Sequence, residues 1–155
     1  MDSSEIAKKL EMIPHPEGGF YKETYRSEEQ CLEGKRSIQT IIYFLLRSSD
    51  VSRFHRIKSD EMWFFHLGSP LVVHTLTENG HIDHHLGNNL ISGETPQLLV
   101  PKNTVFGSTV LYPDSFSLVS CSVAPGFDFE DFELFTAADL QEEYPFNQSI
   151  IARLT

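Results

Sequence analysis

A histidine and a glutamate six positions apart, His55 and Glu61, carry the clearest signal for chemistry in this sequence. If the stretch around His55 is a strand, its alternating side chains put His55 and Ile57 on one face. A turn would follow, and Glu61, Trp63 and Phe65 would then share one face of the next strand. Such a hairpin could bring the imidazole and the carboxylate together beside two aromatic walls.

An adjacent imidazole and carboxylate could do three kinds of chemistry. They could ligate a metal, transfer a proton, or fix the polar group of a bound molecule. They could also be purely structural, because buried polar groups need hydrogen-bond partners and such a pair satisfies itself. The residue types alone leave these roles open.

The elements that must position this pair are short strands. Between residues 20 and 123, stretches typical of strands alternate with turn-forming residues, and no long helical pattern intervenes. Such a pattern indicates an all-β sandwich or barrel rather than a parallel α/β sheet. The expected strands are 20–25, 37–46, 52–57, 61–67, 71–76, 81–86, 97–100, 105–111 and 115–123.

Helices are expected only near the two ends of the chain. Ser3 or Ser4 could cap a first helix that ends before Pro14. Thr136 and Asp139 form a capping-box pattern that predicts a second helix. We see no internal repeat and no linker, so residues 1–155 should form a single domain. The apolar face of the first helix would consist of Ile6, Leu10 and Ile13.

Charge and composition exclude some classes of binding partner. The formal net charge is −10 and no run of Lys or Arg is present, which argues against nucleic acid and against an anionic membrane surface. Cys31 and Cys121 fit no metal or redox spacing, and no apolar stretch is long enough to span a bilayer. We therefore expect a cytoplasmic protein with free thiols.

The residues around the pair resemble a known motif. The first cupin motif, G-x5-H-x-H-x3,4-E-x6-G, is matched by His55-x-Ile57-x3-Glu61-x6-Gly68, and the second is matched loosely by residues 101–106. The chain is most similar to the DUF985 family, also called Cupin_5, in blocks 13–27, 52–61, 93–97 and 123–133. The resemblance implies a cupin double-stranded β-helix, a jelly-roll barrel, often as a homodimer, with a poorly defined function.

Two usual ligand positions of cupins are changed in this chain. Ile57 stands in place of the second histidine of the first motif, and Phe106 in place of the histidine of the second. Neither side chain can donate a lone pair, and transition-metal sites usually have three or more protein ligands. We therefore expect no cofactor, since His55 and Glu61 alone would hold a metal only weakly.

The function that follows is the binding of an unidentified small molecule inside the barrel. The alternative is a metal-independent epimerase or isomerase, similar to the sugar-nucleotide epimerases among cupins, with His55 as base and Glu61, Tyr43 or Tyr21 as its partner. A metal-dependent oxygenase is weakened by the missing ligands. Whether the protein is an enzyme stays open. The expected pocket residues are His55, Glu61, Trp63, Phe65, Ile57, Phe106 and Tyr43.

A second group of possible metal ligands lies further along the chain. As part of a strand, His81, Asp83 and His85 would share one face. Ile82 and Leu86 would then supply the buried face, so a solvated outer hairpin is favoured over a metal site. The single histidines His66 and His74 are interpreted as ordinary sheet residues.

Two further blocks have mainly structural interpretations. Residues 14–19 combine two prolines and two glycines and predict a rigid turn. Residues 125–133 alternate phenylalanines with acids, as an edge strand would. Cys121 is interpreted as an inert buried thiol. The resemblance makes Glu17, Tyr21 and Arg26 candidates for the pocket or a dimer contact. Separately, Asp128 or Asp131 is a weaker candidate for the site.

Overall fold

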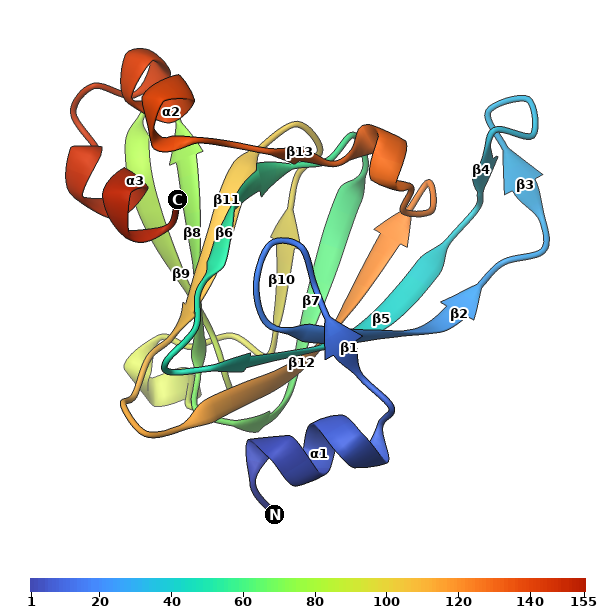
Figure 1. Cartoon of the computed structure of the whole chain (residues 1–155), viewed down its shortest axis with the longest axis horizontal. Coiled ribbons are helices and arrows are strands. Elements are labelled where there is room, and N and C mark those ends of the chain that lie inside the picture. The colour runs from blue at the N-terminus through green and yellow to red at the C-terminus, as the bar shows by residue number, and fades with distance from the viewer.

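Two antiparallel sheets face each other in the computed structural model of the chain, which describes residues 1–155 (Figure 1). The larger sheet has the order β1 (Ile13–Pro14), β2 (Phe20–Arg26), β5 (Thr40–Arg47), β12 (Phe116–Ala124), β7 (Asp60–Gly68), β10 (Gln97–Val100). The smaller sheet has the order β13 (Glu133–Leu134), β6 (Ser52–Arg56), β11 (Val105–Val110), β8 (Leu71–Thr77), β9 (Gly80–Leu86). A separate hairpin joins β3 (Gln30–Cys31) to β4 (Arg36–Ser37).

This arrangement confirms the expected mainly β jelly roll with short terminal helices. The expected closed barrel is not formed by hydrogen bonds, because the two sheets remain separate. The core lies between them, where inner-facing side chains of both sheets meet. Phe44, Trp63 and Val119 come from the larger sheet, and Val73 and Phe106 from the smaller one.

The expected strands are found within one or two residues of their bounds, except where 37–46 divides into β4 and β5. The break follows Ser37, whose hydroxyl proton lies between the carbonyl oxygens of Ser27 (2.6 Å) and Gln39 (3.2 Å). Block 125–133 is not an edge strand. It contains a 3₁₀ turn, η2 (Phe129–Asp131), before the short strand β13; a second such turn, η1 (Leu90–Ser92), precedes β10.

Helix α1 (Ser3–Lys9) begins at Asp2 rather than at a serine. The Asp2 carboxylate accepts the Glu5 N–H at 2.9 Å, and Glu5 reciprocates by accepting the Asp2 N–H. Ile13, expected on the helix, is exposed in β1 because the helix ends earlier. Ile6 packs outside the larger sheet against Leu45 and other apolar side chains.

The capping box of Thr136 and Asp139 is confirmed at the start of α2 (Ala137–Glu143). Helix α3 (Gln148–Arg153), which was not predicted, follows it. Both helices cover the outer face of the smaller sheet, where Leu140 and Ile151 pack against Phe54 (Figure 1). No α-helix of the chain has the length and apolar composition needed to cross a bilayer.

Candidate ligand pocket

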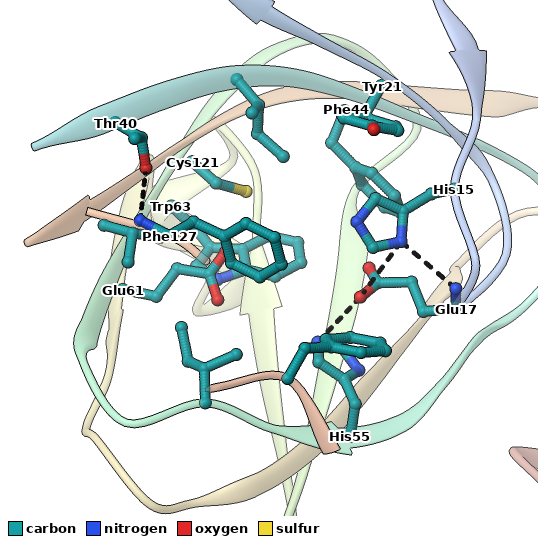
Figure 2. Close-up of a pocket in the computed structure, with 14 residues that line it drawn as sticks. His15, Glu17, Tyr21, Thr40, Phe44, His55, Glu61, Trp63, Cys121 and Phe127 are labelled. Carbon is teal, nitrogen blue, oxygen red and sulfur yellow. Dashed lines mark hydrogen bonds and ion pairs between the residues drawn. The ribbon is translucent and has the colours of Figure 1, made fainter. Parts of the chain in front are cut away.

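A pocket of about 40 Å³ lies between the two sheets (Figure 2). The inner face of the larger sheet forms one wall, and the strand register explains which residues contribute. Glu61 is paired with Val123, and Trp63 with Cys121, across β7 and β12. Cys121 is paired in turn with Ile42 of β5. Because side chains alternate along strands, these cross-strand neighbours share the inner face.

His55 faces this wall from β6 of the smaller sheet, and both of its ring nitrogens have partners. Nδ1 lies 2.7 Å from the Arg53 carbonyl oxygen, and Nε2 lies 2.9 Å from Oε2 of Glu17. A carbonyl can only accept a hydrogen bond, so Nδ1 carries a proton. The direct partner of the histidine is therefore Glu17, not Glu61.

Glu17 reaches the pocket from the turn before β2. Its backbone carbonyl accepts the Arg53 N–H at 2.7 Å, which attaches the turn to β6. Its second carboxylate oxygen accepts the Ser52 hydroxyl at 2.9 Å. Gly18 allows this close approach. Its φ is +114°, and a Cβ at this position would lie 2.0 Å from the Val51 carbonyl oxygen.

The His55–Glu17 pair is fully buried and shares one proton. Burial alone would lower the pKa of His55, but the charge of Glu17 and the hydrogen bond to it raise it. Burial alone would raise the pKa of Glu17, but the charges of His55 and His15 lower it. The favoured state is therefore an imidazolium paired with a carboxylate, an electrically neutral unit.

Glu61 stands across the pocket from this pair, as Figure 2 shows. Burial, reinforced by the negative charge of Glu17, raises its pKa to about 7. It can therefore exchange a proton near neutral pH. On the other side, burial lowers the pKa of His15, whose Nδ1 accepts the Glu17 N–H at 3.2 Å.

Two more buried groups complete this end of the pocket. The indole N–H of Trp63 lies close enough to the Glu61 carboxylate to oppose the rise of its pKa, but it makes no hydrogen bond of normal geometry. Burial, with the charge of Glu61 as a further cause, raises the pKa of the Cys121 thiol well above its ordinary value. Cys121 is thus a neutral thiol, as the sequence indicates.

Phe127 and Phe132, from the segment after β12, close the pocket on one side. The segment is firmly attached to the rest of the fold. The Phe127 N–H donates to the Thr40 hydroxyl at 2.9 Å (Figure 2), and Arg36 binds both carboxylate oxygens of Asp131 at 2.8 and 3.0 Å. We call residues 125–132 the aromatic flap.

Four of the expected pocket residues line the pocket, namely His55, Ile57, Glu61 and Trp63. The other three do not. Phe65 and Phe106 lie in the adjoining core, where the Phe106 ring centroid is 4.2 Å from that of His55. Tyr43 was also expected in the pocket, but its side chain points to the outer face of the larger sheet. There it packs in the cluster around α1, and its ring centroid is 6.0 Å from that of His66.

Among the residues that resemblance suggested, Glu17 and Tyr21 line the pocket. Arg26 does not: it is exposed and donates a hydrogen bond to the Phe127 carbonyl at 3.1 Å. Asp128 and Asp131 also lie outside the pocket and contact Arg36.

Several pocket residues were not expected from the sequence. His15 was interpreted as part of a turn, and the phenylalanines of the flap as an edge strand. Thr40, Ile42 and Phe44 could have been predicted from the sequence. Side chains alternate along the strand expected over 37–46, so these three share one face and Tyr43 lies on the other. The flap carries no such signal, since its position depends on contacts with Arg36 and Thr40.

A metal of the kind that cupins hold does not fit this pocket. Ile57 and Phe106 occupy two of the usual ligand positions and are buried and apolar. Glu17 and His55 are already paired with each other. Among His15, Glu17, His55 and Glu61, no three donor atoms lie within 4.8 Å of one another. The side chains of the pocket therefore do not form a cupin-type metal site.

Comparison with known proteins agrees with this architecture. The model of the family described as "Cupin superfamily (DUF985)" matches residues 4–135. A Saccharomyces cerevisiae protein is 31% identical over 153 residues, covering 87% of this chain and 76% of its own. A solved structure from Shewanella oneidensis is 44% identical with a TM-score of 0.94, covering 100% of this chain and 98% of its own. One from Leishmania major is 36% identical with a TM-score of 0.94, covering 100% and 99%.

Proposed function

Since the chain belongs to the DUF985, or Cupin_5, family of the cupin superfamily, we propose that its interior pocket binds a small, partly polar molecule. The Trp63 indole N–H carries this proposal. It is buried, lines the pocket and makes no hydrogen bond of normal geometry, although the Glu61 carboxylate lies nearby. Buried donors in proteins nearly always have a partner, so this one favours a ligand with an acceptor atom.

The neighbouring groups define the polar end of such a ligand. Glu61 can accept or donate a hydrogen bond, depending on its protonation. The His55–Glu17 pair has no net charge. It can therefore bind a polar group of the ligand that is itself uncharged. Ile42, Val123 and the flap phenylalanines supply apolar contact area on the other sides.

The volume limits the size of the ligand. A cavity needs about 10–15 Å³ of this kind of volume to hold one water molecule. The pocket, at about 40 Å³, therefore accepts only a few non-hydrogen atoms as it stands. A larger ligand would have to displace Phe127 and Phe132, which requires the flap to move.

Proton transfer without a metal, as in an isomerase or epimerase, is the second candidate function. The observation that favours it is a carboxylic acid with a pKa of about 7, facing two histidines across a small cavity. Glu61 could take a proton from a carbon of the ligand, and His15 or His55 could return one on the other side. A pKa close to the working pH suits a group with this role.

The binding proposal is tested on the small molecules that co-purify with the protein, identified by mass spectrometry. Glu61→Gln keeps the shape of the side chain and removes the charge that the carboxylate carries above its pKa of about 7, so binding is compared on the alkaline side of that value. Losing a charge-assisted hydrogen bond costs about 1.5–3 kcal/mol, so the affinity should fall roughly ten- to a hundred-fold. Trp63 is the only tryptophan, so its fluorescence can report the titration.

Tyr43→Phe is the matched control, because it alters a tyrosine on the outer face and should bind like the wild type. If no molecule is enriched, or if Glu61→Gln retains it as the wild type does, the binding proposal is wrong. Catalysis is tested separately by incubation in D₂O. An isomerase should introduce deuterium into the identified molecule in the wild type and not in Glu61→Gln.

A further inference from the structure

A second cluster of ionisable side chains lies far from the pocket, on the outer face of the smaller sheet. In the register of β8 and β9, His74 is paired with Asp83, and Leu76 with His81. Val73, next to His74, belongs to the core between the sheets. Because side chains alternate, His74 and its neighbours on β9 must point to the opposite side.

Three donor atoms of this cluster converge. Nδ1 of His74 lies 2.9 Å from Nε2 of His81 and 2.9 Å from Oδ1 of Asp83. The last two atoms are 2.7 Å apart. Each residue thus turns one possible metal-ligand atom toward a common point, and no other group of three histidine, cysteine or acidic residues in the chain does so.

We propose that His74, His81 and Asp83 form a site for a divalent transition-metal ion such as Zn²⁺. Two imidazole nitrogens and one carboxylate oxygen are the ligand types that such ions prefer. Zn²⁺ is usually four-coordinate, and with bonds of about 2.1 Å the ligand atoms of a tetrahedral site lie about 3.4 Å apart. The three atoms are now in hydrogen-bond or ion-pair contact, so their separations would increase by roughly 0.5–0.7 Å when the ion binds. Water would occupy the fourth position.

The surroundings of His74 suit a metal ligand. Its other ring nitrogen, Nε2, lies 2.8 Å from the Thr109 hydroxyl, which fixes the ring with Nδ1 directed at the cluster. Histidines that bind metals are commonly oriented by such a second contact. His74 is only 4% exposed, whereas the Asp83 side chain is 49% exposed. The site therefore has one rigid ligand and a side open to solvent.

Electrostatics act in both directions at this site. The net charge of −10 favours the approach of cations from solution. Arg153 of α3 is close enough to His74 to oppose the binding of a cation. The carboxylate of Asp83 offsets this positive charge at the point where the ion would bind.

This site differs from the group that the sequence indicated. His81 and Asp83 do share a face, as expected for a strand. His85 is paired with Val72 and does not join them. The third ligand is His74, from the neighbouring strand, which was interpreted as an ordinary sheet residue. The sequence favoured a solvated hairpin without a metal here, whereas the structure gives this hairpin a candidate metal site.

The test is a Zn²⁺ titration of the full chain after removal of metals, followed by calorimetry against a competing chelator. The wild type should bind one equivalent. His81→Ala and Asp83→Asn remove partly exposed ligands and should still fold. Even outer-shell changes weaken metal sites about 10–100-fold, so each variant should lose at least tenfold in affinity.

His85→Ala is the control on the same strand, and Glu17→Gln is the control for the interior pocket; both should bind Zn²⁺ like the wild type. Melting adds a second measurement, since Zn²⁺ should raise the Tm of the wild type and not that of His81→Ala. The proposal fails if the wild type binds no Zn²⁺, if both ligand variants bind it unchanged, or if only Glu17→Gln loses it.

Discussion

His55 and Glu17 illustrate how a buried pair can be polar without adding net charge to the pocket. The Arg53 carbonyl holds a proton on Nδ1, and the Glu17 carboxylate attracts a second one to Nε2. Ser52 supports the carboxylate from its other side. Removing one member of such a pair leaves its partner buried without compensation, which is usually costly.

Glu17→Gln should reverse the direction of the pKa shift of His55. In the wild type, Glu17 raises this pKa above its ordinary value of 6.5. Without the carboxylate, burial remains as the largest influence and should lower the pKa below that value. NMR titration of the imidazole nitrogens measures the change. An unchanged His55 pKa would show that the pair is not coupled as described.

Glu61 should make the stability of the protein depend on pH in a predictable direction. Its pKa rises from 4.5 to about 7 on folding, so the folded state binds the proton more tightly than the unfolded state. The stability it contributes is complete below about pH 4.5 and is lost as the pH rises through about 7. The loss should be on the order of 3 kcal/mol.

The measurement is urea unfolding of the wild type and of Glu61→Gln at several pH values. The free energy of unfolding of the wild type, minus that of the variant, should fall across this pH range and then level off. A difference that stays constant, or that grows with pH, would contradict the raised pKa.

At the scale of elements, two loops complete a pocket that the strands only begin. The turn before β2 contributes His15 and Glu17, and the aromatic flap after β12 contributes Phe127 and Phe132. Each is attached to a neighbouring element by backbone hydrogen bonds: the Arg53 N–H donates to the turn, and the Gly126 N–H of the flap donates to Ser37. These hydrogen bonds hold the backbone of both loops beside the pocket.

Gly18→Ala should displace the turn and with it Glu17. The new Cβ would meet the Val51 carbonyl at 2.0 Å, on a backbone with a φ of +114°. Strain and overpacking together should cost on the order of 2–4 kcal/mol. Gly93→Ala is the control, because Gly93 also has a positive φ (+86°) but has no atom within 4 Å of the new Cβ.

Thermal and urea unfolding measure both variants. Gly93→Ala should lose only about 1 kcal/mol, the usual conformational cost at such a position. If the two variants are destabilised equally, the tight contact with Val51 does not hold the turn. Gly18→Ala should also lower the pKa of His55, because Glu17 would move away from it.

At the scale of the whole molecule, a mainly apolar row crosses the outer face of the larger sheet and is exposed at its two ends. The strand register places Tyr25 beside Ile41, then Ser122, Met62 and finally Leu99 on one line. Tyr25 is 48% exposed and Leu99 49%. Apolar side chains grouped on one exposed face often mark interfaces between proteins.

We propose that a second copy of the chain covers this row in a homodimer. Light scattering at micromolar concentration should then give a mass near twice 17.7 kDa. Leu99→Glu places two like charges at the interface and should weaken association on the order of 100-fold. Ile91→Glu, at a fully exposed residue of η1 that is not part of the row, should not weaken it. A wild type that is only monomeric, or an intact Leu99→Glu dimer, would contradict the proposal.

Local patterns in the sequence determined the class of fold and one wall of the pocket. Alternation along strands is a local property, so the inward direction of Trp63 and Glu61 could be predicted from their spacing alone. The capping box at Thr136 is local in the same sense. Even Tyr43 could have been placed correctly, because Ile42 and Phe44 on either side of it face the pocket.

Only the tertiary structure decided which groups meet across elements. Glu17 reaches His55 because a turn from the larger sheet attaches to β6 of the smaller one, and no local pattern encodes that contact. His74 meets Asp83 through the register of β8 and β9, which a shift of one residue would abolish. The pKa of Glu61 likewise depends on burial and on the charge of Glu17, both of which exist only once the chain is folded.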